Sequence, residues 1–212
     1  ASRLEQQIGD YLKENPADPK KVSLKLARVN LLYRVDPQKA KSYLDDLLRD
    51  SDQQVVEAAR ARLAKFQLLG KPLDLRFTAT DGTAVDLAQL RGKVVLIDFW
   101  ASWCPDCVRE LPEIQRLDHA YRASGLVILG ISLDRDRQAM GNFLAKKGIN
   151  WPIYFDGKGR DNTYAVQYGV RRIPEIWVIN KEGMVETTSA NVSNIDATVQ
   201  RLLKTSQIVQ TP

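Results

Sequence analysis

Cysteine and histidine are scarce in this chain of 212 residues, which contains two cysteines and one histidine. A structural zinc site uses four cysteine or histidine ligands, more than the chain contains. If one continuous helix joins Cys107 to the lone histidine, His119, the two residues lie roughly 18 Å apart along the helix axis, too far to share a metal ion. We therefore expect no metal site, and we interpret His119 as a solvated residue on a helix surface.

Long hydrophobic runs and segregated charge are missing as well. The longest apolar runs, 94–101 and 126–131, have the length of strands, whereas a membrane span needs about eighteen apolar residues. Residues 1–70 contain 13 Lys and Arg against 10 Asp and Glu, and the remainder 18 against 16, which gives +3 and +2 of the net charge of +5. Without a basic block, or a glycine-rich phosphate loop after a strand, we expect no nucleic-acid partner and no nucleotide, flavin or other cofactor.

The two cysteines lie in the segment WCPDC at 103–107, directly after the apolar run 94–99. This pattern predicts a buried strand followed at once by a helix that begins at the cysteines. The unpaired N–H groups and the positive dipole end of a helix N-terminus stabilise a thiolate, which is the attacking species in thiol–disulfide exchange. Cys104 is therefore the candidate nucleophile, and Cys107, nearly one turn later, is the candidate resolving thiol.

Other interpretations of the pair are a structural disulfide, two inert thiols and a Cu(I) site. A structural bond between residues so close in sequence would remove little entropy from the unfolded chain. Inert thiols do not explain the placement at a helix start beside Trp103. A copper-carrying or interaction module, with the helical N-terminal segment as its docking element, stays open as an alternative, although the sequence places no third soft ligand near the pair.

Residues 1–70 are expected to be helical throughout. Apolar residues recur there with helical spacing, Asp36 and Pro37 form a start signal for a third helix, and Ser51 can cap a fourth. We expect two antiparallel hairpins similar to a short helical-repeat array. Because this module has no cysteine and no cluster of catalytic polar residues, we interpret it as a packing appendage or a dimerisation surface, and the oligomeric state stays open.

From residue 71 onward the pattern alternates between strands and helices, which favours an α/β sheet. The expected strands are 93–100, 126–133, 151–155, 175–180 and 184–189, and the expected helices are 105–123, 136–147, 162–168 and 195–204. Asp98 interrupts a strand that should be buried on both faces. Burial raises the pKa of a carboxyl group, and such an acid beneath Cys107 can accept the proton of that thiol. A hydrogen-bonded Asp98 at a strand end is the alternative.

Residues 73–205 resemble the thioredoxin fold and, within it, the TlpA/ResA-like thiol-disulfide oxidoreductases of the AhpC/TSA-redoxin superfamily. The segments that carry the resemblance are DFWASWCPDC at 98–107, Glu110, Pro112 and GVRRIP at 169–174. An inserted stretch around 135–157 also matches this group. The resemblance implies a central mixed sheet flanked by helices at 71–212, and the small all-helical domain at 1–70 lies outside it.

The resemblance also implies how the site is built. A cis peptide bond between Ile173 and Pro174 would lie beside the cysteines, where a partner peptide can add as a strand. Asp98 would accept the proton of the resolving thiol, and Trp103 would pack against the cysteines. Glu110 is a second candidate for proton transfer, or it merely complements the helix dipole.

The expected function is thiol–disulfide exchange that reduces disulfides in exported protein partners. Asp106 lacks the positive charge that would favour a thiolate at Cys104, and Glu175 adds negative charge, so we expect a reductase rather than a strong oxidant. In the group that the chain resembles, the thiol donor protein is often embedded in a membrane. A chain that starts at Ala1 and keeps both cysteines in one reactive pair favours an exported, periplasmic protein, with the cytoplasm as the alternative.

A peroxidase of the related peroxiredoxin group is a further alternative. Such an enzyme would need a threonine and a proline in the loop before its reactive cysteine, whereas Ala101, Ser102 and Trp103 precede Cys104.

Overall fold

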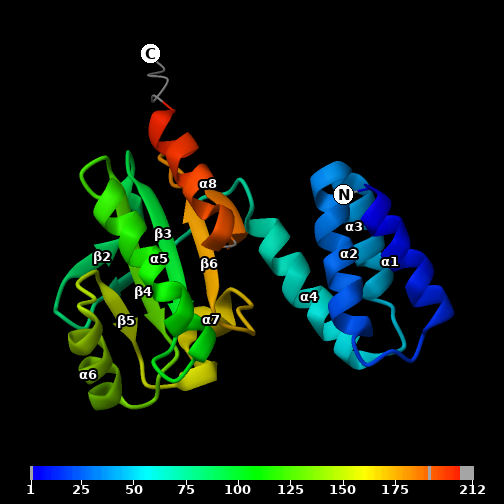
Figure 1. Ribbon diagram of the computed structural model, residues 1–212, viewed down its shortest axis with the longest axis horizontal. Helices are drawn as coiled ribbons and strands as arrows, with labels where there is room; N and C mark the ends of the chain where they lie inside the picture. The colour runs from blue at the N-terminus through cyan, green and yellow to red at the C-terminus, as the bar shows by residue number, and fades with distance from the viewer. Residues whose placement is uncertain (1, 191, 206–212) are drawn as a thin grey trace. The chain divides into compact units, whose positions relative to one another are not determined.

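The structure is a computed structural model that describes residues 2–190 and 192–205. It contains two compact units, Ala1–Ala64 and Lys65–Pro212. The boundary between them lies within helix α4 (Gln53–Leu68), a few residues before the boundary at residue 70 that the sequence predicts. Figure 1 shows the first unit in blue to cyan and the sheet of the second unit mainly in green to orange.

The first unit is all-helical. It contains α1 (Ser2–Glu14), α2 (Lys21–Val35), α3 (Pro37–Leu47) and the first part of α4. Asp36 caps α3 as predicted, because its carboxylate accepts hydrogen bonds from two backbone N–H groups of the first turn. At the start of α4 the prediction of a Ser51 cap is wrong, since the Asp52 carboxylate accepts a hydrogen bond of 2.9 Å from the N–H of Gln54. Serine and aspartate cap helices about equally well, so composition alone does not choose between these neighbours.

The second unit is built on a five-stranded sheet. Its strands are β3 (Val94–Trp100), β4 (Leu126–Ser132), β5 (Ile153–Phe155), β6 (Glu175–Ile179) and β7 (Val185–Ala190), in the order β5-β4-β3-β6-β7. The central strand β3 runs parallel to β4 and antiparallel to β6, and all of its residues are buried. The mixed sheet confirms the predicted fold class. Strands β1 (Arg76–Thr78) and β2 (Ala84–Asp86) form a separate antiparallel pair.

Helices cover both faces of the sheet. They are η1 (Leu87–Leu90), α5 (Pro105–Tyr121), α6 (Arg137–Lys147), η2 (Gly159–Asp161), α7 (Thr163–Gln167) and α8 (Val192–Lys204). Helices α5 and α8 lie on the same side in Figure 1, and Asp196 of α8 accepts hydrogen bonds from Tyr121 at 2.7 Å and from Arg116 at 2.6 Å, both on α5. The predicted insertion at 135–157 contains α6 and β5.

Alternation along β3 decides which side chains reach the two cysteines. Asp98 and Trp100 point to the side of α5, where they line a small cavity together with Cys107. Phe99 points to the opposite side and packs against Trp177 of β6, with ring centroids 5.4 Å apart. The end of β3 therefore delivers an acid to the cysteines and an aromatic side chain to the core on the far side.

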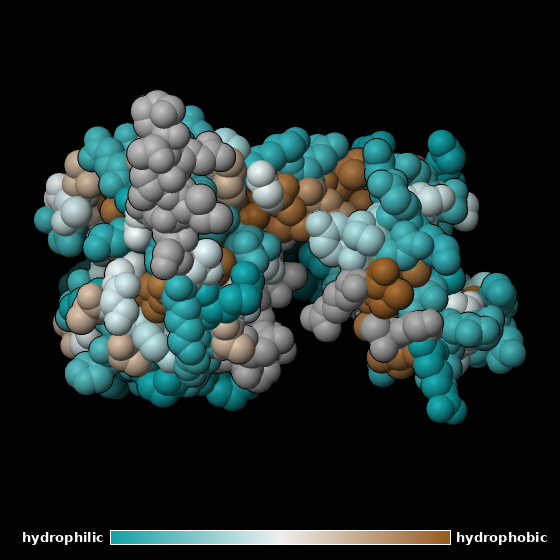
Figure 2. Space-filling model, turned by 90° about the horizontal axis from the view of Figure 1, so that it is seen from above, coloured by the Kyte–Doolittle hydropathy of each residue, from teal (hydrophilic) through white to brown (hydrophobic). Residues whose placement is uncertain are grey.

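The surface is mostly hydrophilic on the face that Figure 2 shows, with hydrophobic residues in separate patches. Among the described residues, the large apolar side chains with high exposure are Leu4, Tyr11, Tyr33, Val35, Trp103 and Val166. Only Trp103 in this group is next to a cysteine in the sequence. An exposed aromatic side chain at that position offers a contact surface for a partner.

Candidate active site

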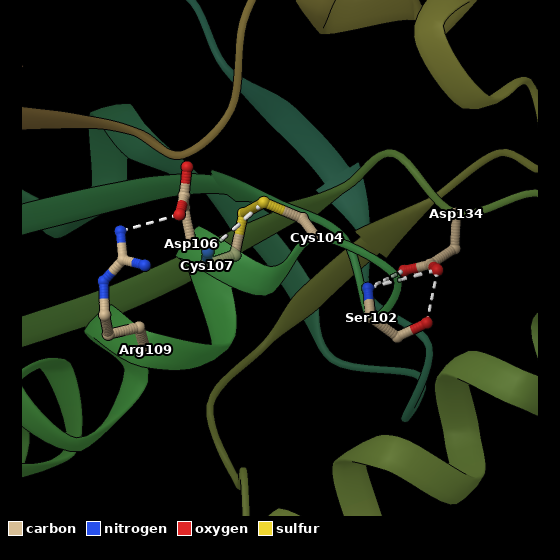
Figure 3. The surroundings of a disulfide bond; sticks show 6 residues. All are labelled: Ser102, Cys104, Asp106, Cys107, Arg109 and Asp134. Atoms are coloured by element: carbon tan, nitrogen blue, oxygen red, sulfur yellow. Dashed lines mark hydrogen bonds and ion pairs between the residues drawn. A yellow bond between two sulfur atoms is a disulfide. The ribbon is translucent and has the colours of Figure 1, made fainter.

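Cys104 and Cys107 form a disulfide bond at the start of α5 (Figure 3). Cys104 is the N-cap of this helix and Pro105 is its first residue. The N–H of Cys107 donates a hydrogen bond to Cys104 Sγ, with an N to S distance of 3.2 Å. In the reduced state this N–H and the helix dipole would favour a thiolate at Cys104. The two cysteines are almost equally buried, so helix-cap geometry and not exposure distinguishes the nucleophile.

Asp98 is a buried acid on β3, as the sequence predicts. Its backbone lies in the sheet in register between Gly130 of β4 and Ile176 of β6, and only 5% of the residue is exposed. Its Oδ1 atom has no hydrogen-bond partner among the described residues. Burial, with a smaller contribution from the negative charge of Glu110, raises the pKa of Asp98 to about 7. The alternative expected from the sequence was a hydrogen-bonded Asp98 at a strand end, and the Oδ1 atom does not fit it.

A small enclosed cavity joins Asp98 to the redox pair. Its volume is about 10 Å³, and its lining includes Asp98, Trp100, Cys107 and Phe143. The Nε1 atom of Trp100 is buried and, like Asp98 Oδ1, has no hydrogen-bond partner in the described part of the chain. Trp100 is a buried core residue, and the sequence pattern gave no sign that its indole N–H would contribute to the cavity.

Glu110 and Asp106 modulate the charge on this side of α5. Burial is the main reason why the pKa of Glu110 is raised, with Arg109 acting against the shift and Asp106 adding to it. Asp106 itself forms an ion pair of 2.6 Å with Arg109, which is seen at the left of Figure 3. Arg109 therefore offsets part of the negative charge that the sequence places between the cysteines.

Asp134 is a functional candidate that the sequence analysis missed. It follows β4, is almost fully buried, and accepts hydrogen bonds from the N–H of Ser102 at 3.0 Å, from Ser102 Oγ at 2.6 Å and from Ser132 Oγ at 2.8 Å. Figure 3 shows this carboxylate turned toward Ser102, two residues before Cys104. Polar residues at the carboxyl ends of two adjacent parallel strands were the signal that could have found it.

Trp103 lies beside the cysteines with 51% of its surface exposed. The guanidinium carbon of Arg160 lies 5.7 Å from the centre of its ring, which is the arrangement of a cation–π contact. Trp103, Leu133 and Arg160 are among the residues that line an open groove of about 430 Å³. The side chain thus contributes to an accessible surface next to Cys104.

Ile173 and Pro174, the other predicted substrate-binding residues, lie at the same end of the sheet. The peptide bond between them is cis. Glu175, which follows, pairs in register with Phe99, so Pro174 lies beyond the start of β6 where β3 approaches the cysteines. The structure thereby brings Ile173, Pro174 and the redox pair to one edge of the molecule.

The family comparison covers most of the second unit and the end of α4. The Redoxin family profile matches residues 62–204. The chain belongs to the Redoxin family. Thiol-disulfide oxidoreductase ResA of Halalkalibacterium halodurans is 31% identical over 105 residues, which cover 50% of this chain and 58% of the relative. ResA of Bacillus anthracis is 33% identical over 111 residues, which cover 51% of this chain and 62% of the relative. The chain therefore spans less than two thirds of the length of these curated relatives.

Solved structures confirm the thioredoxin-like fold of the Redoxin domain. The thioredoxin domain of a thiol-disulfide oxidoreductase from Bacteroides vulgatus has a TM-score of 0.58 at 23% identity and covers 64% of this chain and 98% of its own. A thiol-disulfide oxidoreductase from Bacteroides fragilis has a TM-score of 0.56 at 24% identity, with 60% and 96% covered. The Redoxin match and the ResA relatives bear out the TlpA/ResA-like resemblance, while α1 to α3 lie outside the Redoxin match.

Over residues 2–190 and 192–205, no group of three or more His, Cys, Asp and Glu side chains is arranged to hold a metal ion. Among the helices described, none combines the length and apolar character of a membrane span.

Proposed function

We propose that this Redoxin protein is a thiol–disulfide oxidoreductase that reduces disulfide bonds in exported protein partners. The observation that carries the proposal is the Cys104–Cys107 pair at the N-cap of α5, placed over the buried carboxyl group of Asp98. A nucleophile, a resolving thiol and an acid whose pKa is about 7 form a complete set for dithiol exchange. Confinement of both cysteines to this pair favours an exported protein, because no other thiol can mispair there.

The exchange would begin with the reduced protein. The Cys104 thiolate attacks one sulfur of the partner disulfide, forms a mixed disulfide with it, and expels the other partner sulfur as a thiolate. Cys107 then gives its proton to Asp98 and attacks Cys104 Sγ, which forms the Cys104–Cys107 bond and releases the second partner thiolate. Two electrons pass to the partner, and its thiolates take up protons from Asp98 and from solvent. A second thiol protein must then return two electrons, and in the family it resembles this donor is often membrane-embedded.

Asp98 suits the proton-transfer step because of its surroundings. With a pKa of about 7 it is partly ionised at neutral pH, so it can both accept and release a proton. The cavity of about 10 Å³ is close to the size of one water molecule. A water there would have Trp100 Nε1 as a donor and Asp98 Oδ1 as an acceptor, and it would connect Cys107 to the acid.

The direction of transfer is proposed from charge. Asp106, beside Cys104, is offset in part by Arg109, and the carboxylate of Asp134 holds the segment before Cys104. A site without an excess of positive charge stabilises the Cys104 thiolate only moderately, which favours a reducing pair. A measured reduction potential near the value of about −120 mV that is typical of a strong exported oxidase would contradict this direction.

Trapping with Cys107→Ser tests the function and identifies the partners. Without the resolving thiol, the mixed disulfide at Cys104 persists, and partners can be recovered from intact cells and released by a reductant. The matched control is Cys104→Ser, which removes the nucleophile and should capture nothing. The reduced wild-type protein should also reduce insulin disulfides. Absence of both insulin reduction and Cys104-dependent capture would refute the proposed function.

A further inference from the structure

Lys65 and Glu175 form a nearly buried ion pair within the Redoxin unit. Lys65 Nζ lies 2.6 Å from Glu175 Oε2, and the two side chains are only 10% and 13% exposed. The other carboxylate oxygen, Oε1, accepts a hydrogen bond of 2.7 Å from Nε1 of Trp177. Glu175 is therefore held from two sides, and the negative charge that the sequence placed near the site is neutralised by Lys65.

The pair joins two segments that are 110 residues apart in the sequence. Glu175 is the first residue of β6 and directly follows Pro174, while Lys65 lies in the last turn of α4. Just after α4, Leu69 and Pro72 form β-bridges with Val185 and Met184, which fixes this part of the chain to the sheet at β7. From that fixed position, the Lys65 side chain reaches the start of β6.

Stability does not explain an ion pair at this place. Desolvation of two buried charges can outweigh their attraction, and a well-packed apolar pair is often at least as stabilising. What a buried charge pair provides is directionality, because the lysine and the indole N–H accept only one placement of the carboxylate between them. That placement adds a side-chain constraint to the backbone next to Pro174, at the point where the pairing of β6 with β3 begins.

We propose that Lys65 is a positioning residue for partner proteins, because its ion pair with Glu175 holds the segment at Ile173 and Pro174 in place for an extended peptide that flanks a disulfide. The inference rests on the proposed function, since it concerns the same exchange reaction. A peptide that adds to this backbone edge needs the edge at a defined position. A small disulfide that only reaches Cys104 does not.

The test compares two substrates with the reduced full-length protein. The variants are Lys65→Met, which keeps the length of the side chain without its charge, Lys65→Arg, which restores a cation, and Lys146→Met, a matched control at an exposed lysine of α6. We expect Lys65→Met to lower the second-order rate constant with insulin roughly tenfold, because a misplacement of 1 Å can cost about a hundredfold and a smaller shift of the edge costs less. The rate with cystamine should stay within about twofold, because this small disulfide does not use the edge. Lys65→Arg should recover most of the insulin rate, and Lys146→Met should match the wild type.

Each outcome decides a separate question. If the wild type reduces neither substrate, the proposed function fails. If the wild type reduces insulin but Lys65→Met does so equally well, or slows both substrates alike, the positioning role is refuted and the function stands. Should Lys65→Met fail to fold, the double variant Lys65→Met with Glu175→Met removes both charges, and it must show the same selective loss with insulin.

Discussion

Asp98 should make the folded protein less stable as the pH rises from about 4 to about 7. Burial raises its pKa from an ordinary value of 3.8 to about 7 in the folded protein. Between these two values the folded protein keeps a proton that the unfolded chain has released, so a rise in pH favours unfolding. The destabilisation is absent below the unfolded pKa and is complete above the folded one.

The size of this effect follows from the two pKa values. The difference is about three units, and one unit corresponds to about 1.4 kcal/mol, so the total is about 4 kcal/mol. That is a large share of the roughly 5–15 kcal/mol by which domains are stable. Asp98→Asn keeps the shape of the side chain but cannot ionise. The variant should therefore match the wild type near pH 4 and exceed its free energy of unfolding by up to about 4 kcal/mol at pH 8.

Urea unfolding of the oxidised wild type and Asp98→Asn at several pH values measures this difference directly. Subtracting the two free energies removes the contributions of the titrating groups that do not interact with Asp98. Asp106→Asn, which removes an exposed carboxylate near the same site, controls for the loss of one negative charge. A stability difference that stays constant between pH 4 and pH 8 would refute the reasoning, because it would mean that Asp98 titrates alike in both states.

Three further predictions follow from the same region. Glu110→Gln removes the charge that contributes to the raised pKa of Asp98, so the stability gain of Asp98→Asn should be smaller in that background, as the same urea titration would measure. Asp134→Asn replaces an acceptor that binds Ser102, which should cost roughly 1–3 kcal/mol and speed hydrogen exchange at the Ser102 amide. Leu117→Ala in the core face of α5 should cost about 2–5 kcal/mol in urea unfolding without changing the reduction potential of the redox pair.

Local signals in the sequence were sufficient to predict where the residues at the centre of the candidate site lie. The apolar run before the cysteines, the proline after Cys104 and the acid at Asp98 each act through their immediate neighbours, and the structure places all of them as expected. The mixed character of the sheet followed from the resemblance and not from the periodicity, because apolar spacing does not specify which strands pair. The secondary structure described for the first unit is helices joined by short connections, as predicted, apart from the choice between Ser51 and Asp52 as a cap.

Contacts between side chains of distant segments were not predicted from the sequence. Asp134 meets Ser102 only because β3 and β4 are parallel neighbours, and that rule could have been applied to the polar residues after β4. No comparable rule links Lys65 to Glu175, since one belongs to a helix and the other to a strand far along the chain. Both charges are buried by the fold, and burial is itself a tertiary property that the local sequence does not show.

Asp98 and Asp134 show how one residue type serves two purposes at the end of adjacent strands. Three donors, the N–H and hydroxyl of Ser102 and the hydroxyl of Ser132, converge on Asp134, so its carboxylate is satisfied and fixes the backbone before Cys104. Asp98 Oδ1 has no such donor within the described residues. The free energy of unfolding therefore depends on whether the Asp98 carboxyl group carries a proton. A satisfied carboxylate suits a fixed framework, whereas an unsatisfied one suits proton transfer. The supply of donors, more than burial alone, thus separates the residue that holds the site from the one that would take part in its chemistry.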